Sequence, residues 1–110
     1  MTPAQIADVL DLAVEELEAN PWGQGLTRYS NEADRGICAI DALSVVIAGK
    51  VRPHSAMSQV LFDTERAVMQ TLTLNPRLMS LANWNDVPGR TKQQVIDAFK
   101  NTAKDLRNQA

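Results

Sequence analysis

Apolar residues recur at helical spacing near both ends of the chain. Thr2 and Thr91 are each followed three residues later by a glutamine. This spacing is that of a capping box, in which the hydroxyl accepts a free helix amide and the glutamine returns to the threonine amide. Helices are therefore predicted from Thr2 to Asn20 and from Lys92 to about Arg107. Their expected core positions are Ile6, Val9, Leu10, Ala13, Val14 and Leu17 in the first, and Val95, Ile96, Phe99, Ala103 and Leu106 in the second.

The stretch from about 37 to 48 is the most apolar part of the chain. Its apolar residues cover almost the whole circumference of a helix, so we expect that helix in the centre of the fold. Only a narrow stripe around Asp41 is small or polar, and Gly49 is the expected C-cap. The stretch 44–47 is mostly β-branched and also allows a strand, but the chain has no second strand pattern to pair with it. We therefore predict a helix.

A further helix is predicted from about 55 to 72, followed by a short one. Its apolar stripe consists of Met57, Val60, Leu61, Thr64, Val68 and Leu72. Phe62 and Met69 lie beside that stripe and widen it beyond what one neighbouring helix needs. Either this helix contacts two others, or Phe62 and Met69 belong to a subunit or partner interface. The short helix is expected to be capped at Asn75-Pro76 and to carry Leu78, Met79, Leu81 and Ala82.

These elements predict an all-α fold, a single domain over 1–110 with four to five helices around the central one. A chain of 110 residues that is 45% hydrophobic can fold without disulfides or a metal. Its single cysteine excludes an internal disulfide and suits a reducing cytoplasm. No apolar run reaches the roughly 18 residues of a membrane helix, and the N-terminus lacks a signal-peptide pattern. A cytoplasmic protein with no membrane partner is expected.

The charges are distributed unevenly along the chain. The first twenty residues hold five acidic and no basic side chains, whereas the part from Arg90 onward holds five basic and two acidic ones. We expect the first and last helices to lie near each other with opposite charges facing. The net charge of -2 offers no basic field for a phosphate backbone, so nucleic-acid binding is disfavoured. A helix-turn-helix reader built from the last two helices stays open as an alternative.

The stretch from Trp84 to Thr91 holds an unusual density of versatile side chains. Pro88-Gly89 predicts a rigid turn between the last two helices. The side chains around it either tie the turn to its neighbours or hold a ligand, and we favour the structural role. A second aromatic and an amide stand in a glycine-containing loop after the first helix. The binding candidates are Trp22, Gln24, Trp84, Asn85, Asp86 and Arg90.

The leading enzymatic alternative is a cysteine-dependent hydrolase or transferase. Cys38, His54 and Asp86 follow the order of nucleophile, base and orienting group in thiol hydrolases. A catalytic cysteine should be a partly exposed thiolate, whereas Cys38 is expected inside the most buried helix. One histidine, one cysteine and scattered carboxylates give no metal-ligand spacing, and no phosphate-binding glycine motif is present. Neither a metal nor another cofactor is expected.

Three segments resemble an uncharacterised domain family of actinobacteria and their phages. The most specific is Trp84-Asn85-Asp86-Val87-Pro88-Gly89-Arg90-Thr91, and the others are Trp22-Gly23-Gln24-Gly25 and Cys38-Ala39-Ile40-Asp41-Ala42-Leu43. The third segment departs from the family pattern at Asp41, where the family tends to have glycine. The resemblance implies a phage or actinobacterial source and no known activity, ligand or catalytic residue.

These observations predict a small non-enzymatic interaction or regulatory module, such as a phage accessory protein that acts on a host protein in the host cytoplasm. The partner is expected to be another protein or a second copy of the chain. The face that carries Phe62 and Met69 is the predicted interface.

Overall fold

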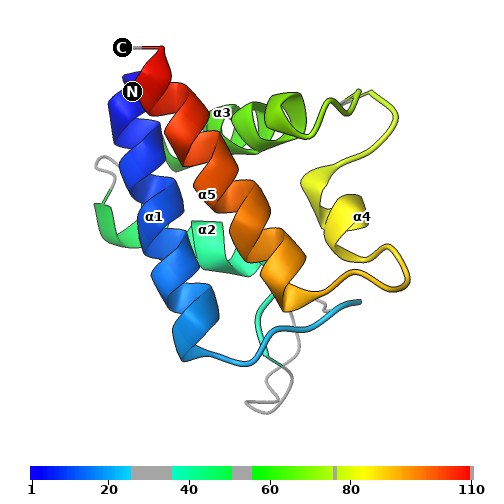
Figure 1. The fold of residues 1–110 in the computed structure, drawn as a ribbon. Coiled ribbons are helices and arrows are strands. Elements are labelled where there is room, and N and C mark those ends of the chain that lie inside the picture. Colours follow the sequence, from blue (N-terminus) through cyan, green and yellow to red (C-terminus); the bar gives the residue numbers. More distant parts are fainter. Residues whose placement is uncertain (26–35, 51–55, 76, 110) are drawn as a thin grey trace.

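Helices make up most of the computed structural model, which describes residues 1–25, 36–50, 56–75 and 77–109. They are α1 (Pro3–Ala19), α2 (Ala39–Lys50), α3 (Met57–Thr71), α4 (Leu81–Asn85) and α5 (Lys92–Asn108) (Figure 1). The predicted all-α fold is confirmed for the described residues, whose only β-pairing is an isolated bridge. Most of the polar run at 27–36 and the basic link with His54 lie outside them. None of the described helices is long and apolar enough to cross a membrane.

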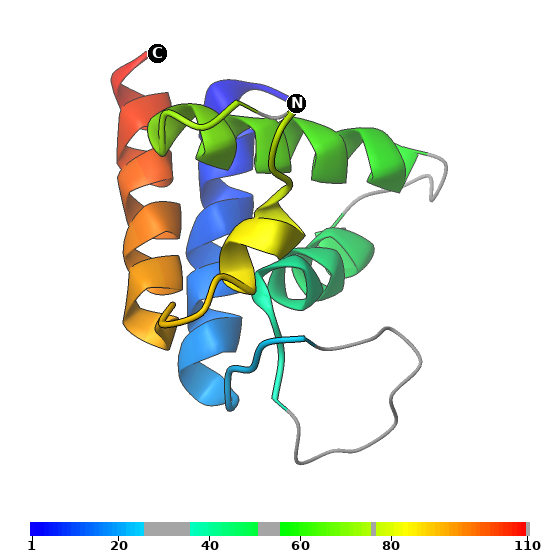
Figure 2. The same ribbon diagram turned by 90° about the vertical axis from the view of Figure 1, so that its right-hand side faces the viewer.

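The first and last helices form an antiparallel pair, side by side in both ribbon views (Figures 1 and 2). Both predicted capping boxes are present, at Thr2 and at Thr91. Every predicted core position of the two helices is buried, because each helix turns its apolar stripe toward the interior. The predictions for α1 and α5 are therefore confirmed.

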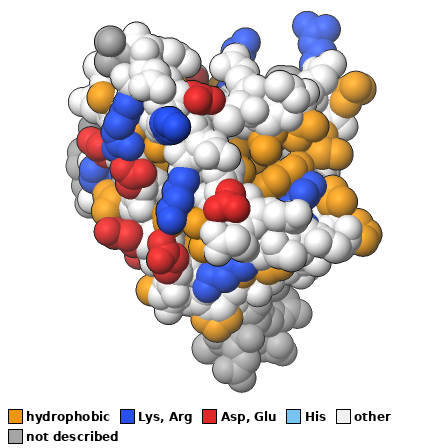
Figure 3. All heavy atoms as spheres, in the orientation of Figure 1, with side chains coloured by type: hydrophobic (Ala, Val, Ile, Leu, Met, Phe, Trp, Pro, Cys, Tyr) orange, Lys and Arg blue, Asp and Glu red, His pale blue; other side chains and the backbone are white. Residues whose placement is uncertain are grey.

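Opposite charges meet along the α1/α5 pair, as expected from their distribution in the sequence. Arg107 donates to carboxylate oxygens of Asp8 at 3.0 Å and Asp11 at 2.6 Å. At the other end of the pair, Lys92 Nζ donates to the Asn20 carbonyl at 2.9 Å. Figure 3 shows acidic and basic side chains interleaved on this face.

The α2 helix begins two residues later than predicted and ends later as well. Its buried side chains pack against α1, α3 and α4, while Val45 is 55% exposed on the outer side. Gly49 lies within the last turn rather than at the C-cap, because the helix continues to Lys50. Before the first turn, Asp41 Oδ2 accepts the Cys38 amide at 3.1 Å, so the carboxylate meets a backbone donor.

The α3 helix lies across the α1/α5 pair near the chain termini (Figure 2). The predicted start of the next helix at Asn75 is wrong. Asn75 Oδ1 accepts the Arg77 amide at 2.9 Å within a turn, and α4 begins only after Ser80. Ser80 Oγ accepts the Asn83 amide at 3.1 Å, so this serine is the N-cap that starts the helix.

Candidate functional site

Three segments that are far apart in the sequence meet around Asn85, whose side chain is fully buried. Its Oδ1 accepts hydrogen bonds from the Trp22 indole at 2.8 Å and from the Ala39 amide at 3.1 Å. Its Nδ2 donates to the Gly23 carbonyl at 3.2 Å and to Asp86 Oδ1 at 3.1 Å. A side-chain amide has two donors and two accepting lone pairs, so Asn85 uses its full bonding capacity inside the protein.

Two neighbouring side chains extend this network between the loop after α1 and the turn after α4. Gln24 Nε2 donates to the carbonyls of Asn85 at 3.0 Å and Val87 at 2.8 Å. Asp86 Oδ1 also accepts the Gly25 amide at 2.9 Å. These bonds join the two backbone segments directly; the bond to the Asn85 carbonyl is partly buried, and the other two are exposed. The network is called the Asn85 cluster below and consists of Trp22, Gln24, Asn85 and Asp86.

A short parallel pairing holds the other side of the same loop. The Ile37 amide donates to the Pro21 carbonyl at 2.7 Å, and the Gly23 amide donates to the Ile37 carbonyl at 3.1 Å. Gly36 adopts φ +77°, and a Cβ there would lie 2.5 Å from the Pro21 carbonyl oxygen. Only glycine combines the required φ with this close approach of two backbones.

Trp84 and Arg90 stabilise the turn from the side of α5. The Trp84 side chain is buried, and the Arg90 guanidinium carbon lies 4.1 Å from the centroid of its ring. Arg90 Nε donates to the Trp84 carbonyl at 3.0 Å. Among the described residues, Asp86 and Arg90 form no ion pair with each other, so each holds the turn through separate partners. This geometry supports the structural role of the turn, and a ligand site there stays a prediction.

Cys38 immediately precedes α2, although the sequence places it inside that helix. Burial raises the pKa of its thiol, and the neighbouring Asp41 carboxylate raises it further, against backbone hydrogen bonds that lower it. The thiol therefore stays protonated near neutral pH, which is unfavourable for a nucleophile. The Asp86 carboxylate is bonded to Gly25 and Asn85, and His54 lies outside the described residues. In the part of the chain described, no three potential ligands group as a metal site.

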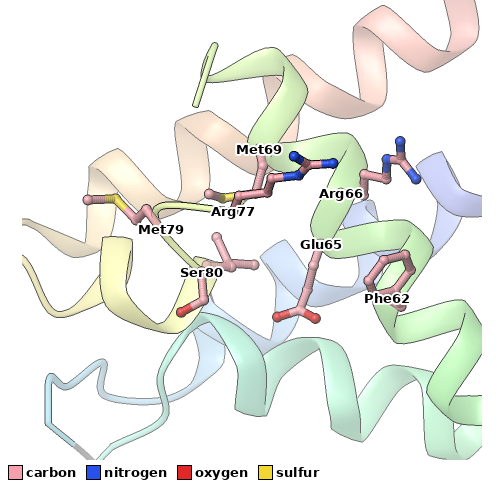
Figure 4. Close-up of a pocket in the computed structure, with 8 residues that line it drawn as sticks. Phe62, Glu65, Arg66, Met69, Arg77, Met79 and Ser80 are labelled. Atoms are coloured by element: carbon pink, nitrogen blue, oxygen red, sulfur yellow. The ribbon is translucent and has the colours of Figure 1, made fainter. Parts of the chain in front are cut away.

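A hollow of about 490 Å³ lies between α3 and the segment that leads into α4. A hydrophobic patch lies between these elements in the space-filling view (Figure 3). Figure 4 shows Phe62 on the α3 side of the hollow and Met79 and Ser80 on the side of the incoming segment. We call this hollow the α3–α4 groove; its lining residues are Phe62, Glu65, Arg66, Met69, Arg77, Met79, Ser80 and Leu81.

The two predicted interface residues contribute to this groove in different ways. Met69 is only 2% exposed, so it belongs to the core as well as to the lining. Phe62 is 56% exposed, and Leu78, which stands between two lining residues in the sequence, is 83% exposed. The sequence interpretation placed Leu78 in a helix that does not form there, and it therefore missed this side of the groove.

Two arginines that the sequence interpretation did not select stand at the groove. Arg66 belongs to α3 and Arg77 to the opposite segment, and both side chains are exposed. Within the described part of the chain, neither guanidinium forms an ion pair. The groove thus combines apolar surface with two arginines and the Glu65 carboxylate, and the two arginines are available to a partner.

Comparisons with known proteins give one result. No curated protein and no solved structure matches the chain. Residues 1–105 match the sequence model of a family of unknown function, DUF6197. Because this match covers nearly the whole chain, the protein belongs to the DUF6197 family.

Proposed function

We propose that this protein is a small non-enzymatic interaction module that binds another protein through the α3–α4 groove. The observation that carries the proposal is the exposure of Phe62 in the lining of a largely apolar hollow, opposite the segment that carries the exposed Leu78. Large apolar side chains gathered at one hollow mark interaction sites more often than singly scattered ones do. The volume of about 490 Å³ lies within the range of binding pockets, about 300 to 1,000 Å³.

The composition of the groove supports a protein partner. Aromatic residues, methionine and arginine are enriched at the cores of protein interfaces, and Phe62, Met79 and Arg77 supply one of each. Methionine is flexible, so Met79 can adapt its shape to a partner side chain. In such interfaces a few buried side chains supply most of the binding energy, and a groove of this size can hold side chains of that kind from a partner.

The two alternatives receive less support. A thiol hydrolase needs a reactive thiolate, and burial raises the pKa of Cys38 instead. A helix-turn-helix reader needs two helices free to lie on DNA, but α4 has five residues and buries Leu81, Trp84 and Asn85. A phage or actinobacterial origin, a host-protein partner and a cytoplasmic location complete the proposal, on the strength of the motif resemblance and the single cysteine.

Photo-crosslinking in a lysate of the source organism tests the proposal. Benzoylphenylalanine is placed at position 62 or 78, and at position 45 as the control, because Val45 is an exposed apolar residue on α2. We expect positions 62 and 78 to capture the same protein and position 45 to capture none of it. Capture that is equal at all three positions, or absent from 62 and 78, contradicts the proposal.

A further inference from the structure

We infer that the partner presents an amphipathic helix with acidic flanks to the α3–α4 groove, an inference that rests on the proposed function. Its apolar side chains would enter the groove between Phe62 and Met79, and its carboxylates would pair with Arg66 and Arg77. The inference defines the partner by its chemistry: a helical segment with bulky apolar anchors and nearby Asp or Glu.

The helical form follows from how backbone groups are satisfied at an apolar surface. A bound strand usually pairs its amides and carbonyls with an open sheet edge. A polyproline segment docks on a groove lined by aromatic side chains, and this lining holds one, Phe62. The described residues contain no sheet, only the isolated bridge between Trp22 and Ile37. A helix satisfies its own backbone and presents anchors at i, i+3, i+4 and i+7, which suits a groove bounded by α3.

The acidic flanks follow from the charges at the groove. Arg66 of α3 and Arg77 of the opposite segment both line the groove, and neither forms an ion pair with another described residue (Figure 4). The lining also holds the Glu65 carboxylate, so positive charge exceeds negative charge there by two groups to one. Arginine can bind a carboxylate through two parallel hydrogen bonds, so each is suited to an acidic side chain. The chain as a whole carries a net charge of -2 and does not attract an acidic segment from a distance. The preference must therefore come from these two local contacts.

A second copy of this chain fits the groove less well. Its most acidic helix is α1, which turns its apolar side into the core of its own chain. Two of the carboxylates on its outer side, Asp8 and Asp11, already pair with Arg107. This helix therefore has no free apolar anchors beside those carboxylates. A separate amphipathic segment would have them.

Selection from a displayed library of random 16-residue peptides tests the inference. The full chain serves as bait, and a Phe62→Ser, Leu78→Ser double variant removes peptides that bind elsewhere. Affinities of the selected peptides are then measured by fluorescence anisotropy at low salt, where charge pairs contribute most. We expect acidic, apolar sequences with helical spacing of their anchors.

Two charge-reversal variants supply the decisive comparison. Arg66→Glu with Arg77→Glu should weaken binding about tenfold, since two exposed attractions become repulsions. Lys100→Glu with Lys104→Glu makes the same change in net charge on the exposed side of α5 and should weaken it less than about twofold. Equal effects of the two variants, or no effect of the first, overturn the inference.

Other outcomes separate the inference from the proposed function. Peptides that need Phe62 and Leu78 but show no acidic preference remove the inference and leave the groove as a protein-binding site. If the binding of no peptide requires these two residues, the inference is overturned. The crosslinking experiment then decides alone whether the groove binds a protein. A dimer that the Phe62→Ser, Leu78→Ser variant dissociates would place a second copy in the groove and would overturn the inference too.

Discussion

The Asn85 cluster and the α3–α4 groove use their side chains in opposite ways. In the cluster, a fully buried amide satisfies all its donors and acceptors within the chain. In the groove, Phe62 stays largely exposed, and Arg66 and Arg77 have no ion-pair partner among the described residues. A dense motif can therefore serve the fold, whereas a surface with exposed apolar side chains and unpaired arginines is the better candidate for binding.

The same comparison explains three dense segments of the sequence. Segments 22–25, 38–43 and 84–91 meet at Asn85. The first supplies the Trp22 indole, the second supplies the Ala39 amide, and the third supplies Asn85 itself. These groups thus make their contacts within the chain.

The largest effect is expected from Asn85→Ala. The change leaves the Ala39 amide without its partner in a buried place, and the Trp22 indole and the Gly23 carbonyl without theirs in partly buried ones. The buried group costs about 1 to 3 kcal/mol and the partly buried groups about 1 kcal/mol each, so we expect a loss of about 3 to 5 kcal/mol of unfolding free energy. Urea denaturation measures it, with Asn83→Ala as the exposed control in the same helix. A loss below about 1 kcal/mol would show that the cluster is not central to stability.

A smaller loss is expected from Gly36→Ala, which tests the backbone pairing beside the cluster. The left-handed φ and the contact with the Pro21 carbonyl together should cost about 2 to 4 kcal/mol. Gly49→Ala is the matched control, because a Cβ there meets nothing within 4 Å and Gly49 lies in a helix. It should stabilise the chain by about 0.5 kcal/mol. Similar effects of the two changes would contradict the close approach at Gly36.

Asp86→Ala and Arg90→Ala address the choice between structure and ligand binding at the turn. Each removes hydrogen bonds to the chain itself, and Arg90→Ala also removes the stacking on Trp84. We expect each to lower the unfolding free energy by about 1 to 3 kcal/mol, seen as a lower melting temperature. Groups kept for an absent ligand behave otherwise, since their removal leaves stability unchanged or improved. Melting temperatures at or above the parent's would move the functional surface to this turn.

The mildest effect concerns Cys38, beside the cluster. Because burial raises the pKa of its thiol, little thiolate is present near neutral pH. Iodoacetamide should therefore modify native Cys38 more slowly than it modifies the urea-unfolded chain, and the rate should rise with pH toward the raised pKa. Native labelling as fast as in the unfolded chain would favour the hydrolase alternative.

The helices could be predicted from the sequence where local residues determine them. Thr2 and Thr91 cap α1 and α5 through groups only three residues away, so both starts were correct. The sequence misplaces the start of α2 because the Ile37 backbone pairs with Pro21 and Gly23, which no local pattern indicates. The start of α4 was misplaced because Ser80, rather than Asn75, provides the cap next to the buried Leu81.

The candidate sites could be predicted only in outline. The side chains at 84–91 indicate either contacts that hold the turn in place or a ligand site. Local patterns cannot decide between these, because the hydrogen-bond partners lie 61 to 63 residues away in the sequence. At the groove, Phe62 was selected because it widened the apolar stripe. The sequence does not indicate Arg66 and Arg77, because the two walls meet only after α3 and the segment before α4 pack together.

The most direct test of the contrast between the two regions is the affinity of the crosslinked partner for two folded variants. Asp86→Ala, measured below its melting temperature, should bind the partner as tightly as the parent chain despite its lower stability. The free energy of unfolding of the Phe62→Ser, Leu78→Ser variant should lie within about 0.5 kcal/mol of the parent's value, because both residues are exposed. This variant should nevertheless lose most of its affinity for the partner. The opposite pattern, with binding lost in Asp86→Ala and kept in the groove variant, would contradict the account.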